Sequence, residues 1–66
     1  MFTLYFSDKW GTPGSSEYGS LEECYESALK MAQAKTARPL KITKGAEVIV
    51  DSGGLWQEIN KRLGSD

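Results

Sequence analysis

The sequence contains no histidine and only one cysteine, Cys24, among its 66 residues. Without histidine the chain lacks the commonest general acid–base side chain, and one cysteine can form neither an internal disulfide nor a cysteine–histidine zinc site. The neighbouring Glu23 would raise the pKa of the Cys24 thiol rather than activate it as a nucleophile. We therefore expect a protein that is not an enzyme and that uses no metal and no cofactor.

The charges are nearly balanced, with eight Lys and Arg against nine Asp and Glu and a net charge of −1. Such a balance gives no overall attraction to nucleic acid or to an anionic membrane. The apolar run at the N-terminus is too short for a signal-peptide core, and no run is long enough to span a bilayer. A lone cysteine suits a reducing compartment. These features predict a cytoplasmic protein without a membrane partner.

Apolar residues make up 39% of the chain, which suits one small domain covering residues 1–66. The alternation of aromatic and polar residues over 2–7 predicts a half-buried strand. Glycine, proline and serine cluster over 8–16, which indicates a loop. We interpret residues 17–19 as a short edge strand that returns beside the first one.

Residues 20–36 carry the strongest helix signal. Ser20 and Glu23 form a capping box, in which the serine side chain accepts a hydrogen bond from the backbone N–H three residues later. The apolar residues that follow recur at the spacing of one helical face. Pro39 disfavours the helical conformation at Arg38, so the helix should end by about Ala37.

Residues 40–51 read as a hairpin around Gly45. A three-residue loop over 43–45 places glycine at the position that prefers a left-handed backbone. It also keeps most apolar residues on one face of the sheet, with Ile49 on the other face. The predicted cross-strand pairs are Leu40–Val48, Lys41–Glu47 and Ile42–Ala46.

A second, short helix is predicted over 54–63, after the Ser52–Gly54 break. The fold class is therefore α+β, in the order β-(β)-α-β-β-α, with the 20–36 helix packed on one face of a short sheet. The second helix could pack on either face. We favour the same face as the first helix, because Lys41 and Glu47 beside Ile49 would be costly to bury. The predicted core face of the sheet comprises Phe2, Leu4, Phe6, Leu40, Ile42, Val48 and Val50.

By elimination, the leading functional hypothesis is a small domain that binds another protein. The opposite sheet face would then be open, as a binding surface or as the seam of a homodimer. An exposed tryptophan in the 8–16 loop is a further candidate contact. The predicted partner-binding residues are Tyr5, Trp10, Lys41, Thr43 and Ile49. In size and in the absence of catalytic chemistry the chain is similar to phage- and plasmid-encoded inhibitors or regulators of host machinery.

The alternative hypothesis is a nucleic-acid-binding module. Residues 30–44 contain five basic side chains and no acidic one, whereas residues 17–26 contain four acidic side chains and no basic one. A basic stretch beside an aromatic side chain such as Tyr5 is typical of single-strand binding. Equally, such lysines can serve only to keep a small domain soluble and to complement a helix end. The basic residues of this alternative are Lys30, Lys35, Arg38, Lys41 and Lys44.

Overall fold

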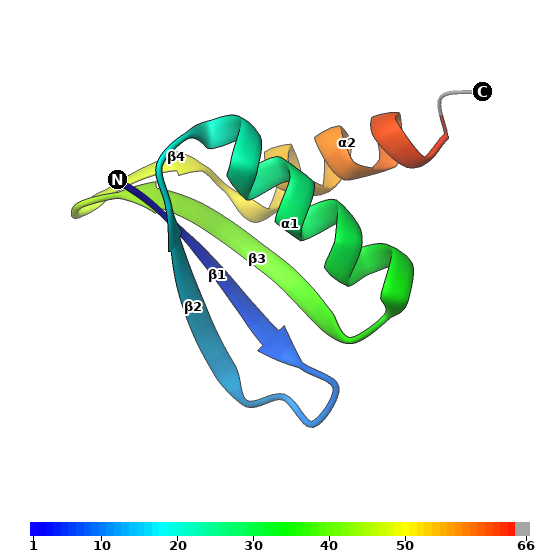
Figure 1. Cartoon of the computed structure of the whole chain (residues 1–66). Coiled ribbons are helices and arrows are strands. Elements are labelled where there is room, and N and C mark those ends of the chain that lie inside the picture. The colour runs from blue at the N-terminus through cyan, green and yellow to red at the C-terminus, as the bar shows by residue number, and fades with distance from the viewer. Residues whose placement is uncertain (65–66) are drawn as a thin grey trace.

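The computed structural model describes residues 1–64 and has the predicted α+β architecture (Figure 1). Four strands and two helices follow one another in the order β-β-α-β-β-α. Their bounds are β1 Phe2–Asp8, β2 Pro13–Tyr18, α1 Leu21–Ala34, β3 Ala37–Lys44, β4 Glu47–Val50 and α2 Ser52–Leu63.

The four strands form one antiparallel sheet in the order β2-β1-β3-β4, so that β1 and β3 lie in the centre. β2 begins at Pro13 and is therefore longer than the predicted 17–19 strand, taking up part of the predicted 8–16 loop. It pairs with β1 from Ser7–Pro13 to Phe2–Tyr18. Gly14 lies opposite Phe6 in this pairing. A Cβ at Gly14 would come within 2.8 Å of the Phe6 ring, so the ring packs where only glycine leaves room.

Both helices cover the same face of the sheet, as predicted (Figure 1). One core cluster combines side chains from β1, β3, α1 and α2. Leu55 and Ile59 bring α2 into that cluster. This packing stabilises α2, because an amphipathic helix of this length is too short to persist alone in water. The completely buried apolar members are Leu4, Cys24, Ala28, Ile42, Leu55 and Ile59.

The capping box opens α1, although the helix is shorter than the predicted 20–36. The Glu23 amide donates to Ser20 Oγ at 3.3 Å, and the Ser20 hydroxyl lies 3.3 Å from the Glu23 carboxylate. At the other end, Lys35 adopts a left-handed conformation with φ 57° and its N–H donates to the Met31 carbonyl. No glycine marks this end, so the sequence pattern placed it two residues too late.

α2 begins two residues before the predicted 54–63 segment. The Asp51 side chain caps it by accepting a hydrogen bond of 2.8 Å from the Gly54 amide. On the next turn, the Trp56 indole N–H donates to the Pro39 carbonyl at 3.0 Å. β4 pairs only with residues 42–44 of β3, so this bond satisfies a carbonyl where β3 has no β4 neighbour.

The predicted register of the β3–β4 hairpin is wrong. The turn has two residues, Gly45 and Ala46, and the positive φ of 66° at Gly45 suits the first central position of a primed turn. Ile49 is an extra residue that bulges out of the ladder. The observed pairs are Ile42–Val50, Thr43–Val48 and Lys44–Glu47, so Glu47 does not face Lys41 and Val48 leaves the core face.

A second bulge lies where β1 pairs with β3. Tyr5 pairs with Lys41, but Phe6 pairs with Pro39, so Leu40 is the extra residue. Pro39 is therefore fully buried in the position predicted for Leu40, which is only half-buried. Proline has no N–H to donate and is tolerated at bulges and beside an unpaired strand edge.

Arg62 links α2 to α1. Its guanidinium donates to both carboxylate oxygens of Glu22, at 2.8 and 3.0 Å, and to Glu58 at 2.9 Å. It also lies 5.2 Å from the centre of the Tyr25 ring. The hydrogen bonds from Arg62 lower the pKa of the Glu22 carboxyl. In residues 1–64 no helix has the length and apolar character needed to cross a membrane.

Candidate functional site

The sheet face opposite the helices has no layer over it (Figure 1), and we call it the open face. Side chains alternate between the faces of a strand, and Leu4 and Ile42 point to the helices. Their neighbours therefore point away from the helices. By register, the open face brings together Thr3 and Tyr5 of β1, Lys41 and Thr43 of β3, and Val48 of β4.

Tyr5 and Lys41 form a pair on the open face. They lie opposite each other in the β1–β3 ladder, and the Lys41 ammonium lies 5.2 Å from the centre of the Tyr5 ring. Tyr5 keeps 37% of its surface exposed. Within residues 1–64 Lys41 forms no salt bridge. The pair therefore offers an aromatic ring and an unneutralised cation to a partner.

Thr43 has an unusual environment for a residue on an uncovered face. Only 5% of its surface is exposed, and its Oγ1 is buried without a hydrogen-bond partner among the described residues. A buried hydroxyl without a partner costs about 1–3 kcal/mol.

Apolar side chains gather beside Thr43. Ile49, at the bulge of β4, is 39% exposed, and Val48, which pairs with Thr43, is 49% exposed. A regular hairpin would put Val48 in the core and Ile49 on the open face, whereas the bulge moves Val48 to the open face. We define the open-face patch as Tyr5, Lys41, Thr43 and Val48, together with the exposed bulge residue Ile49 beside Val48 on the edge strand.

Trp10 does not belong to this patch. It lies in the β1–β2 loop, at the opposite end of β1 from the β3–β4 turn, and 79% of its surface is exposed. The Asp8 carboxylate accepts hydrogen bonds of 2.9 Å from the amides of Trp10 and Thr12 and so orders the loop. The Lys9 ammonium lies 4.5 Å from the indole centre. The structure thus separates one predicted contact residue from the other four.

The five basic residues of the nucleic-acid alternative are distributed over different surfaces. Lys41 lies on the open face, whereas exposed Lys30 belongs to α1 on the covered face. Lys44 lies 5.5 Å from the Phe2 ring, near the β3–β4 turn. It is six residues along β3 from Arg38, which corresponds to about 20 Å. These side chains do not form one continuous strip.

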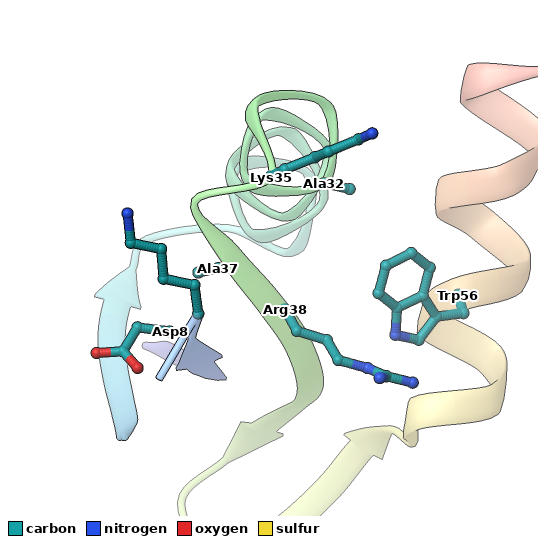
Figure 2. A pocket seen from close by; sticks show the side chains of 7 residues that line it. Asp8, Ala32, Lys35, Ala37, Arg38 and Trp56 are labelled. Atoms are coloured by element: carbon teal, nitrogen blue, oxygen red, sulfur yellow. The ribbon is translucent and has the colours of Figure 1, made fainter. Parts of the chain in front are cut away.

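Lys35 and Arg38 both line a pocket of about 250 Å³ between the end of α1, the start of β3 and α2, although their charged ends lie apart, above and below the Trp56 ring in Figure 2. Lys9, Asp8, Trp56 and two alanines complete its lining. Figure 2 shows Lys35 and Arg38 extending toward the side on which the Trp56 ring stands. The Asp8 carboxylate points the other way. The sequence singled out Lys35 and Arg38 but gave no sign that Trp56 stands beside them.

Cys24 lies in the core and is not exposed. Burial raises the pKa of the Cys24 thiol, and the Glu23 carboxylate raises it further. A protonated, inaccessible thiol is a poor nucleophile. In the described part of the chain, no group of three or more His, Cys, Asp or Glu side chains is placed to hold a metal ion.

Comparison with known proteins gives no match to a protein-family model, a curated protein or a solved structure. The candidate sites therefore depend on the geometry and chemistry of this chain alone.

Proposed function

We propose that this protein is a non-enzymatic binding domain that docks another protein on its open-face patch. The observation that carries the proposal is the exposure of Tyr5, Val48 and Ile49 around Thr43, whose buried hydroxyl has no partner among residues 1–64. Apolar surface that is gathered on one face and bordered by polar side chains is typical of protein interfaces. An exposed aromatic residue in such a patch is a typical hot spot.

The patch also defines the chemistry of the partner. Apolar side chains would cover Val48 and Ile49, since their burial supplies the main free energy of association. An acidic side chain would pair with Lys41, which has no salt bridge within residues 1–64. The expected partner therefore presents an apolar surface that contains at least one carboxylate.

Nucleic acid is the weaker candidate for this surface. Lys41 is the one residue of the five-member basic set in the patch, and a nucleic-acid footprint normally requires several cations along one groove. Binding that falls steeply with salt concentration would favour nucleic acid, because phosphate contacts release counterions. A largely apolar protein contact changes little with salt.

Site-specific photo-crosslinking tests the proposal. A photoreactive phenylalanine at Tyr5 should crosslink to a protein in cells that express the chain naturally. The matched control carries the same group at Glu26, which is exposed on α1 and lies on the opposite layer. Crosslinking from Glu26 but not from Tyr5 would contradict the proposal.

Two further results would define the partner. A crosslinked product of twice the chain mass would make the partner a second copy, and sedimentation equilibrium of the purified chain would then show a dimer. A product with a different protein identifies an external partner. Whether the chain inhibits or regulates that partner is then measured as the change in the partner's activity on adding the purified chain.

A further inference from the structure

The pocket between α1, β3 and α2 is a second potential binding site, independent of the open-face patch. We propose that it binds a small phosphate monoester that carries a flat ring. The phosphate would bind at the cationic rim of the pocket, within reach of the exposed Lys35 and Arg38 side chains, and the ring would lie against Trp56.

The pocket has a local excess of positive charge. The chain as a whole has a net charge of −1, yet three cations, Lys9, Lys35 and Arg38, and one carboxylate, Asp8, line this pocket. None of the three cations forms a salt bridge within residues 1–64. Arginine and lysine together form strong charge-assisted hydrogen bonds to phosphate oxygens.

Asp8 is the acidic side chain that could neutralise this charge. One oxygen of its carboxylate accepts hydrogen bonds from the Trp10 and Thr12 amides, both at 2.9 Å. In Figure 2 the carboxylate points away from Lys35 and Arg38. Asp8 therefore serves the β1–β2 loop and leaves the cations on the Trp56 side uncompensated.

Trp56 is the aromatic side chain that lines the pocket. Trp56 is half-buried, and its indole N–H is held by the Pro39 carbonyl at 3.0 Å, so the ring has a fixed orientation. The Arg38 guanidinium lies 6.0 Å from the centre of that ring. A ring and a guanidinium in this arrangement can receive the flat and the charged ends of one ligand.

The size of the pocket limits the ligand. Its volume of about 250 Å³ is below the range of about 300–1,000 Å³ that is typical of sites for drug-sized molecules. A single phosphate with one ring fits this scale better than a dinucleotide or a large cofactor. The phosphate and the ring should both contribute, because neither the cations nor Trp56 alone encloses the ligand.

Titration of the purified chain with phenyl phosphate, followed by NMR, tests the proposal. The chain has two tryptophans, so its spectrum contains two side-chain indole N–H signals, which a Trp10→Phe variant assigns. Phenyl phosphate should shift the Trp56 signal in a saturable way and leave the Trp10 signal in place. Inorganic phosphate and phenol, added separately, should bind at least about tenfold more weakly, since each lacks one of the two contacts.

Matched variants locate the site. Arg38→Gln and Lys35→Gln should each weaken phenyl phosphate binding roughly tenfold, because each removes a charge-assisted hydrogen bond. Lys44→Gln removes the same charge from the far end of β3 and should leave binding unchanged. Equal weakening by all three variants, or no saturable shift of the Trp56 signal, would overturn the proposal.

A short single-stranded oligonucleotide provides the final arm of the experiment. The proposal predicts that it binds no more tightly than phenyl phosphate at equal phosphate concentration. Tighter oligonucleotide binding that Arg38→Gln and Lys44→Gln both reduce would overturn the small-ligand assignment and would favour a nucleic-acid site.

Discussion

The two faces of the sheet differ in how much of their apolar surface is buried and in whether their buried polar atoms have hydrogen-bond partners. On the covered face, helices α1 and α2 enclose apolar side chains that have no exposed surface, such as Leu4 and Ile42. On the open face, Tyr5 and Val48 keep a third to a half of their surface exposed. Thr43 combines deep burial with a hydroxyl that has no partner among the described residues.

The open face also differs from the usual composition of a solvated sheet face. An antiparallel sheet commonly has one solvated face, and that face is usually polar. Here the solvated face carries apolar side chains and an unneutralised lysine, which add little to the stability of the isolated chain. The covered face therefore holds the core, and the exposed apolar side chains of the open face are the ones that a partner would cover under the proposed function.

The largest expected effect compares one isoleucine from each face. Ile59→Ala opens a cavity in the core and should cost about 2–5 kcal/mol. Ile49→Ala makes the same chemical change at the exposed bulge and should cost about 1 kcal/mol or less. Urea unfolding followed by circular dichroism measures both. Equal losses would mean that the open face contributes to the core as much as the covered face does.

The next effect concerns the turn that brings Val48 to the open face. Gly45→Val places a β-branched side chain at a φ of 66° and should cost about 1–2 kcal/mol. The control Ala46→Val changes the other turn residue, which has no positive φ, and should stay within about 0.5 kcal/mol. If thermal melting of Gly45→Val matches that of the wild type, the turn is not the one described.

A change at Thr43 should not lower the stability of the fold, unlike the two changes above. Thr43→Val removes a buried hydroxyl that has no partner within residues 1–64, so stability should stay equal or rise by up to about 1 kcal/mol. The same substitution should leave partner binding unchanged, because the buried hydroxyl is not accessible to a partner. Thermal melting and a binding assay on one preparation measure the two effects. A clear loss of stability would show that the hydroxyl is already satisfied in the free chain.

The smallest expected effect is the pH dependence of the contact between α1 and α2. Hydrogen bonds from Arg62 lower the pKa of Glu22 below its ordinary value of 4.5, so the ion pair stabilises the folded state at neutral pH. That contribution should fade as the pH drops from about 4.5 through the lowered pKa.

Glu22→Gln should therefore reduce the melting temperature slightly at pH 7 and not at all at pH 2, with a smaller reduction in high salt. Glu26→Gln, which changes an exposed acid on the same helix, is the matched control. A pH-independent difference between Glu22→Gln and the wild type would contradict this account of the ion pair.

Much of the fold could be predicted from local chemistry. The Ser20–Glu23 capping box and the apolar spacing after it located α1, because caps and helical periodicity act over a few residues. The cost of burying Lys41 correctly indicated that α2 would cover the other face. The Asp51 cap was missed, although an aspartate before a helix is a recognisable signal.

The hairpin itself was predicted, but its register and the β1–β3 pairing were not, because each contains a bulge that strand periodicity does not reveal. A regular strand alternates with a period of two, and each bulge shifts that alternation by one residue. The bulge at Leu40 buries Pro39, whose carbonyl is satisfied by Trp56 from a distant helix. The bulge at Ile49 moves Val48 to the open face.

The candidate sites were predictable to different extents. Tyr5, Lys41 and Thr43 lie on one face as predicted, because strand alternation is a local property, whereas Ile49 is the extra residue of a bulge. Trp10 lies elsewhere, because the position of a loop does not follow from periodicity. The pocket beside Trp56 was missed as a site, since it combines Lys35, Arg38 and an α2 side chain that meet only after the helices pack.

The most direct test of the difference between the two faces is the affinity of two single variants for the partner isolated with the wild-type chain. Tyr5→Ala removes the aromatic ring of the open-face patch, and Trp10→Ala removes the most exposed aromatic residue outside it. The open-face account predicts that Tyr5→Ala weakens binding about tenfold or more and that Trp10→Ala leaves it unchanged. Intact binding by Tyr5→Ala together with loss of binding by Trp10→Ala would contradict it.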